Sequence, residues 1–490
     1  MKFLLSWDAI FASIALCGMV LIPVIEVLFR PIQGSGIDNA PILVQHLGLL
    51  FSLGGAIYAE RTGHLTSLGS LWQDIKNPVL HKIARAWVFL FSSFICGVLA
   101  EAGYELMASE LDAGHTIAYG VPTWLFLSSL PIGFVILGIK FGLRWHDNIV
   151  LKIVGLSLAM LASLYSTQWL LELSFAGPLL TVVLLSFLIL GGPIFLVLGG
   201  LSWALFSIEN IPMAALALSH YQITVNPSLP ALPLFTLAGL IFANSQAAQR
   251  LSQLFIAAFG TGQIGTVFAV ACLCSCFTAL TGGSGVTILA LGGLMLPLLL
   301  KANYPESKSI GLITSASSLG VLLAPSVPLI MYAIIAKVPI NTMFVAGIVP
   351  AVLMIFSLVI FGGFLNTRNK GILEINQEPV QILPEFTNRP SFKQALWNSK
   401  WELLAPLIAV GSLISGFATP TEGAALTVVY ALLTQGLVHR ELKWANFQVC
   451  LMQTAQIIGG ILLIMGMALG LTNYLIDVGI PDMASDWVQG

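Results

Sequence analysis

Five glycines and one proline interrupt an apolar segment at residues 281–297, which would otherwise form a plain membrane helix. A broken helix in hydrocarbon exposes backbone N–H and C=O groups that only protein, water or a bound solute can satisfy. The glycines allow a tight turn, and the helix that follows points its N–H groups towards that turn, where they attract a carboxylate. The alternative is close packing of small residues between helices. The candidate residues of the predicted hairpin tip are Thr281, Gly282, Gly283, Ser284, Gly285 and Thr287.

Two prolines, Pro325 and Pro328, break a second apolar segment. Proline has no backbone N–H, so carbonyls upstream of each proline lose their partners. Those carbonyls and the hydroxyl of Ser326 are oxygen ligands that suit a sodium ion. The alternative is a simple kink in which Ser326 bonds back to its own helix. Two breaks in one polytopic chain are typical of secondary transporters, and we predict that both breaks meet at one ion and solute site. Its candidates here are Ala324, Pro325 and Ser326.

The segment Thr419-Pro420-Thr421-Glu422 is typical of a helix start. Thr419 would be the N-cap, Pro420 the first helical residue and Glu422 its capping-box partner. A carboxylate at membrane depth is also a functional candidate, which leaves ion coupling by Glu422 as an alternative. Thr419 and Thr421 are further candidates for the same ion and solute site.

The sequence contains no motif that clearly indicates catalysis. Gly282 to Gly285 match the GxSG pattern of intramembrane serine proteases, in which a later histidine activates the serine. The only histidine after Ser284 is His439, in a charged connection, so a catalytic dyad is not expected. The other histidines are scattered singly, and the six cysteines match no metal or redox motif. We therefore expect a protein that is not an enzyme.

The composition predicts an all-α polytopic membrane protein. The 490 residues are 57% hydrophobic and 9% charged, with a mean hydropathy of +0.93, far outside the soluble range. The chain has 20 Lys and Arg against 22 Asp and Glu. That balance gives no basic excess for nucleic acid, which is not expected as a partner.

Apolar segments of membrane-spanning length predict five helices, at 7–29, 40–59, 84–107, 122–143 and 150–170. The first segment is too long for a signal peptide and is expected to stay as a membrane anchor. Basic residues gather in alternate loops, which predicts a cytoplasmic amino terminus, with Arg30 as the one exception. The polar segment 366–400 is predicted to be a cytoplasmic loop.

The chain divides into three predicted parts. Residues 1–148 form a four-helix module, and 149–176 form a linking helix. Residues 177–490 contain longer apolar runs that Gly and Pro interrupt, which predicts a second module with a re-entrant hairpin and broken helices.

These segments resemble the membrane component of TRAP transporters, the tripartite ATP-independent periplasmic family. The resemblance rests on residues 278–300, 315–334, 344–353 and 418–432, with 233–245 as a weaker match. Residues 44–65 are similar to the small membrane subunit of the family, which here would be fused to the large subunit.

The resemblance implies a sodium-driven importer of an organic acid in the bacterial inner membrane. A soluble periplasmic binding protein would deliver the carboxylate, and Na⁺ would be the coupling ion without any other cofactor. A transport domain within the second module would move like an elevator against a scaffold, with membrane lipid around it. The family has a second inverted half with its own hairpin, and nothing after Val449 contains one. The resemblance therefore leaves two expectations, a truncated large subunit or a divergent form such as a non-transporting membrane scaffold.

Overall fold

The computed structural model describes residues 7–33, 37, 39–166, 176–260, 262–302, 304–361 and 391–489. Within these residues the regular structure is helical, and extended backbone pairs only at two isolated bridges, Ser67 with Pro193 and Thr116 with Pro122. The described residues contain 10 helices that are long and apolar enough to cross a membrane, or up to 11 if one bent pair counts as a span. The protein is thus a polytopic α-helical membrane protein.

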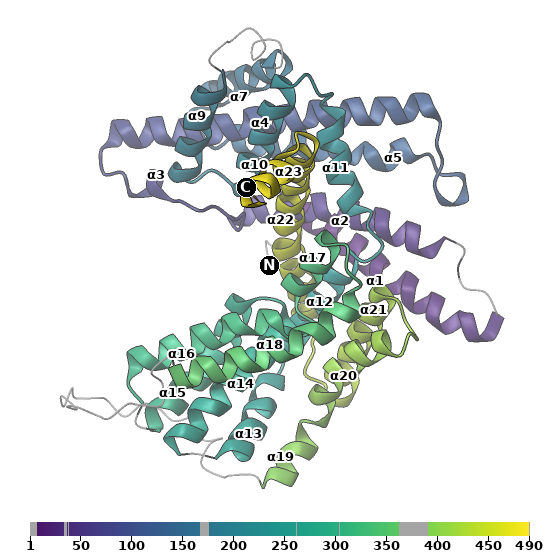
Figure 1. The fold of residues 1–490 in the computed structure, drawn as a ribbon, viewed down its shortest axis with the longest axis vertical. Coiled ribbons are helices and arrows are strands. Elements are labelled where there is room, and N and C mark those ends of the chain that lie inside the picture. The colour runs from purple at the N-terminus through teal and green to yellow at the C-terminus, as the bar shows by residue number, and fades with distance from the viewer. Residues whose placement is uncertain are drawn as a thin grey trace. The chain divides into compact units, whose positions relative to one another are not determined.

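The chain forms two compact units (Figure 1). Unit 1 comprises residues 1–18, 37–227 and 455–490, and unit 2 comprises 19–36 and 228–454. The helices that lie wholly or partly in unit 1 are α1 (Trp7–Gln33), α2 (Ala40–Thr62), α3 (Leu71–Asp74), α4 (Pro78–Ala113), η2 (Ala118–Gly120), α5 (Thr123–Leu127), α6 (Ser129–Gly142), α7 (Ile149–Leu164), α9 (Ala176–Leu190), α10 (Ile194–Ile208), α11 (Ala214–Thr224), α22 (Trp444–Asp477) and α23 (Ile480–Gln489).

Unit 1 is built around α4, which packs against α6, α7, α10 and α11. Its core includes the buried side chains of Ile95, Phe134 and Trp203. Helices α2 and α22 touch through backbone, because a methyl added at Gly55 would lie 2.5 Å from the Ala455 carbonyl oxygen. Small residues allow such close crossings between membrane helices.

Basic residues that the sequence assigns to one side of the membrane lie together in unit 1. Lys140 and Arg144 at the end of α6 lie 3.3 Å and 3.0 Å from the carboxylate of Glu60, which is buried near the end of α2. Arg61 lies 3.2 Å from Asp8 at the start of α1. These ion pairs fit the predicted alternation of loops, while the cytoplasmic orientation of that side stays a prediction.

Unit 2 contains the two predicted breaks (Figure 1). Its helices are α12 (Ala231–Ala243), α13 (Ala247–Phe259), α14 (Gln263–Thr281), α15 (Ser284–Lys301), α16 (Glu306–Leu319), η3 (Gly320–Leu322), α17 (Val327–Ile335), α18 (Ile340–Phe361), α19 (Phe392–Asn398), α20 (Lys400–Ile414), α21 (Pro420–Leu432) and the π-helical η5 (Leu433–Val438), joined by the first part of α22 and the second part of α1. Helix α14 is central, since it packs against α12, α13, α15, α16 and α18.

The predicted first four spans correspond to α1, α2, α4 and the α5–α6 pair. The predicted fifth span, 150–170, is helical as α7 to Leu164, while its residues 167–170 and the next part of the linking segment, 171–175, lie outside the described residues. The predicted boundaries at 148 and 176 stay a prediction, because the compact units divide the chain at other positions.

The polar segment 366–400, which is predicted to be a cytoplasmic loop, contains a short helix at its end. Residues 366–390 lie outside the described residues, but Phe392–Asn398 form helix α19 rather than a loop. A capping box between Ser391 and Gln394 starts this helix, and the fully buried Ala395 anchors it where α19 packs against α13.

Candidate functional site

Helices α14 and α15 form a helical hairpin whose turn consists of Gly282 and Gly283. Gly282 has φ +73°, a left-handed conformation that favours glycine, and its N–H donates to the Thr278 carbonyl at 2.9 Å. Gly283 is extended and precedes the first residue of α15, Ser284. The predicted tip residues Gly285 and Thr287 therefore lie in the first turns of α15 and not in the turn itself.

The glycines of this segment do not serve close packing in general. Among the described residues, a methyl added at Gly285 or Gly293 would meet no atom within 4 Å. Only Gly282 has a tight neighbour, since its added methyl would lie 2.6 Å from Val327 Cγ2. The alternative of helix packing through small residues therefore holds at Gly282 alone.

Three threonine hydroxyls meet just inside the tip. Thr278 donates to the hydroxyl of Thr287 at 2.7 Å, and the hydroxyls of Thr281 and Thr287 lie 3.0 Å apart. All three side chains are buried. Thr281 and Thr287 are among the residues predicted from the sequence, whereas Thr278 is not. Thr278 lies three residues before Thr281, on the same face of α14. The cluster offers oxygen atoms without any carboxylate.

The second break lies between α16 and α17. Helix α16 passes into the short η3, the backbone is extended at Leu323 and Ser326, and α17 begins at Val327. The hydroxyl of the buried Ser326 donates to the carbonyl of Val321. Ser326 thus bonds back to its own segment, as the alternative reading required, and satisfies one of the carbonyls that the break frees.

The structure brings both breaks together. Gly282 of the hairpin turn lies against Val327, the first residue of α17. A methyl added at Gly320 of η3 would lie 2.3 Å from the Ser275 carbonyl oxygen of α14, and the Ser275 hydroxyl donates to the Ala316 carbonyl at 2.9 Å. The hairpin and the broken helix therefore share one packed site in unit 2.

Helix α12 forms the third wall of this site. A methyl added at Gly239 would lie 2.0 Å from the Leu280 carbonyl oxygen and 2.5 Å from the Thr281 Cα. Thr236, one turn earlier, has its hydroxyl 3.5 Å from the methyl position of Gly282. The weaker match at 233–245 thus contributes backbone contact to the hairpin tip.

The predicted capping box at the start of α21 is confirmed. The Thr419 backbone N–H donates to Glu422 at 2.8 Å, and the Glu422 N–H donates to the Thr419 hydroxyl. Glu422 also pairs with Arg30 of α1, which in turn lies 3.1 Å from Glu26. These pairings explain why Arg30 departs from the predicted charge pattern. Helix α21, which contains Thr421, packs against α12 and α20.

His439, the histidine considered for a catalytic dyad, lies beside a carboxylate of α20. The Nε2 atom of His439 lies 3.7 Å from Glu402. In the part of the chain that the structure describes, no three His, Cys, Asp or Glu side chains are grouped so that they could hold a metal ion.

Unit 2 is therefore a membrane module in which a helical hairpin packs against a broken helix, an architecture known from secondary transporters. The family model described as "Tripartite ATP-independent periplasmic transporter, DctM component" matches residues 181–490. The chain belongs to this family, whose members are transporter permeases rather than enzymes.

Curated relatives agree with this assignment. The isethionate TRAP transporter permease protein DctMQ of Oleidesulfovibrio alaskensis is 27% identical over 62% of the chain and 47% of the relative. The C4-dicarboxylate TRAP transporter large permease protein DctM of Pseudomonas aeruginosa is 28% identical over 59% of the chain and 65% of the relative. The ectoine TRAP transporter large permease protein TeaC of Halomonas elongata is 33% identical over 44% of the chain and 48% of the relative. The chain thus spans about half to two thirds of these relatives.

Proposed function

We propose that this chain is the membrane subunit of a secondary active transporter that imports an organic acid. Its relatives are named for isethionate, C4-dicarboxylates, ectoine and 2,3-diketo-L-gulonate, all of which are small polar compounds with an acidic group. The family name supports delivery by a periplasmic binding protein and a location in the bacterial inner membrane. A fused small subunit is supported by the similarity to DctMQ.

The observation that carries the proposal is the contact between the two breaks, Gly282 against Val327. Helix α15 starts at this contact, so its free N–H groups are available to a carboxylate. The proposed solute and ion site comprises Thr281, Gly282, Gly283, Ser284, Gly285, Thr287, Ala324, Pro325, Ser326, Thr419 and Thr421.

Sodium is the proposed coupling ion. The hydroxyls of Thr278, Thr281 and Thr287 and the carbonyls around both breaks are neutral oxygen ligands, which suit a small hard cation. Bound sodium would also place a positive charge beside the solute carboxylate. Glu422, which is already occupied by its cap and by Arg30, is proposed to hold α21 in place and not to bind the ion.

Uptake by reconstituted vesicles tests this proposal. We expect vesicles that contain the protein to accumulate a labelled organic acid only with a binding protein outside and an inward sodium gradient. The panel would include isethionate and a C4-dicarboxylate. Replacing the sodium gradient by an equal potassium gradient should abolish uptake. Unchanged uptake in potassium would contradict sodium coupling, and uptake without the binding protein would contradict the proposed delivery.

A further inference from the structure

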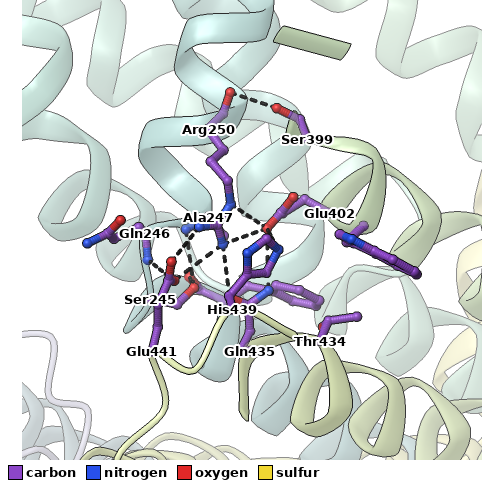
Figure 2. A network of polar contacts seen from close by, with 12 residues as sticks. Ser245, Gln246, Ala247, Arg250, Ser399, Glu402, Thr434, Gln435, His439 and Glu441 are labelled. Carbon is purple, nitrogen blue, oxygen red and sulfur yellow. Dashed lines mark hydrogen bonds and ion pairs between the residues drawn. The ribbon is translucent and has the colours of Figure 1, made fainter. Parts of the chain in front are cut away.

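A cluster of charged side chains around the buried Glu402 joins α13, α20 and η5 with its following loop (Figure 2). Arg250 of α13 is at its centre. The Arg250 guanidinium donates to Glu402 at 2.8 Å, to Glu441 at 2.5 Å and to the Gln435 side-chain oxygen at 3.0 Å. The backbone N–H of Gln246 also donates to Glu441 at 2.9 Å. One guanidinium thus connects three helical segments of unit 2.

The charges in this cluster do not balance. Arg250 supplies one positive charge against the two carboxylates of Glu402 and Glu441. Glu402 is only 1% exposed, and its Oε2 atom has no hydrogen-bond partner among the described residues. Burying an unbalanced charge is costly, and a buried polar atom without a partner adds to that cost. The cluster therefore lacks one positive charge beside Glu402.

His439 is placed to supply that charge. Its Nε2 atom lies 3.7 Å from Glu402 Oε1 and, within the described part of the chain, forms no hydrogen bond. The charged groups near it are Arg250 from α13, Glu402 from α20 and Glu441 from the loop after η5. Tyr430 of α21 is close enough to Glu402 to interact with its charge, and Arg440 and Lys443, which flank Glu441 in the sequence, are exposed. Histidine is the side chain of this set that ordinarily changes its charge near neutral pH.

We propose that Glu402 and His439 form a proton-binding site. One proton from solvent forms an N–H bond at His439 Nε2 or an O–H bond at Glu402 Oε2, and the pair holds it as a unit. With this proton the four charged groups sum to zero, and without it they sum to one negative charge. The proton requires no other reactant and leaves the hydrogen bonds of Arg250 to Glu402 and Glu441 in place.

The site gives the module a pH-sensitive joint. Helix α13 follows α12 after a bend of 76°, and α12 contacts the hairpin tip through Gly239. The cluster fixes the α13 side of this bend, because Arg250 also accepts a hydrogen bond from Ser399 at its carbonyl, at 2.8 Å. Loss of the proton should therefore destabilise α13 before it destabilises the other helices of unit 2. This inference concerns the joint and does not depend on which solute the protein moves.

The first test is thermal unfolding of the purified full chain in detergent, followed between about pH 6 and about pH 8, the range in which histidine changes charge. Because the folded cluster takes up a proton, its stability is present at acidic pH and is lost as pH rises. We expect the unfolding midpoint of the wild type to fall over this range. The fall should be absent in His439→Gln and in Glu402→Gln. The exposed His64→Gln is the matched control and should keep the wild-type dependence.

The second test needs no substitution. Backbone hydrogen exchange at residues 247–259, corrected for the intrinsic effect of pH, should become faster above neutral pH, by at most about tenfold per pH unit for one proton. Exchange in α4 of unit 1 should not change. Equal pH dependence in the wild type and in His439→Gln would overturn the proposal, as would pH-independent exchange in α13.

Discussion

The threonine cluster at the hairpin tip is the most specific chemical feature of the site. Thr287 lies within hydrogen-bond distance of two other buried hydroxyls, and each hydroxyl keeps further acceptor capacity. Two of the three residues could be predicted from the sequence, because they flank the glycine turn. Thr278 could not be singled out before the end of α14 was known, because a threonine inside an apolar helix usually bonds to its own backbone.

Replacing Thr287 by valine should impair both stability and transport. The change leaves the buried hydroxyl of Thr278 without its partner, which costs about 1–3 kcal/mol of unfolding free energy. The Thr281 hydroxyl loses one contact but keeps the Thr278 and Gly283 carbonyls within hydrogen-bond distance. We also expect the variant to need a higher sodium concentration than the wild type for half-maximal uptake into vesicles. The matched control is Thr427→Val, since within the described residues the Thr427 hydroxyl bonds only to the Gly423 carbonyl of its own helix. Equal sodium dependence in both variants would argue against a sodium site at the tip.

Adding a methyl group should destabilise the protein at Gly282 of the turn but not at Gly285 of α15. Gly282→Ala forces alanine into a left-handed conformation, at about 1–2 kcal/mol, and pushes against Val327. Gly285→Ala places its methyl in open space within α15, where alanine is favoured by up to about 1 kcal/mol. Thermal unfolding of the two variants checks this order. A more stable Gly282→Ala would contradict the described turn.

At the scale of helices, the sequence indicated some interruptions and missed others. The glycine turn and the proline break are visible because their residue types directly restrict the backbone. The bend between α12 and α13 has no such residue, since residues 244–246 are Asn-Ser-Gln. It depends on local bonds, such as Ala247 N–H to the Ser245 hydroxyl, and on Glu441, which accepts from Gln246 across 195 positions. Such distant partners cannot be read from a single sequence.

The cap of α21 should contribute measurably to stability. Thr419→Ala removes the acceptor for the Glu422 N–H, a loss that typically costs about 1 kcal/mol. We expect a lower unfolding midpoint in Thr419→Ala, whereas Thr419→Ser should keep it. An unfolding midpoint of Thr419→Ala equal to that of the wild type would show that the cap does not limit unfolding of unit 2.

The loop that follows η5 should make the protein acid-sensitive. Burial raises the pKa of Glu441, but hydrogen bonds from Arg250 and the Gln246 N–H, together with the charge of Arg250, outweigh it, so the pKa lies below its ordinary 4.5. A lowered pKa in the folded state contributes stability that is fully present above pH 4.5 and is lost as pH falls through the folded value. Glu441→Gln should remove this acid-dependent part of the unfolding free energy. The exposed Glu306→Gln serves as control and should retain it.

At the scale of the whole molecule, composition and charge pattern were enough to predict a polytopic helical protein. The make-up of the two compact units could not be predicted. The second part of α1, Met19–Gln33, belongs with residues 228–454, and the ion pair between Arg30 and Glu422 spans 392 positions. The sequence showed Arg30 only as an exception to a charge rule. Its partner became evident once α1 and α21 were both in place.

Helix α4 allows a direct test of the predicted orientation. Lys76 precedes this helix and Asp112 lies near its end, and both side chains are exposed. In intact cells, a membrane-impermeant thiol reagent should label Asp112→Cys, and Lys76→Cys only after permeabilisation. The reverse pattern would place the amino terminus outside and would overturn the positive-inside prediction.

The contact between α12 and the hairpin tip fixes the distance between them, and side-chain movements cannot change it. Gly239 meets Leu280 and Thr281 through backbone atoms, so rotamer changes do not alter the spacing of these two elements. Peptide geometry, which varies by only a few degrees, fixes that spacing instead. A library of variants covering unit 2 should therefore accept many residues at most lipid-facing positions but only glycine at 239. The backbone, rather than the side chains, therefore determines the dimensions of the site.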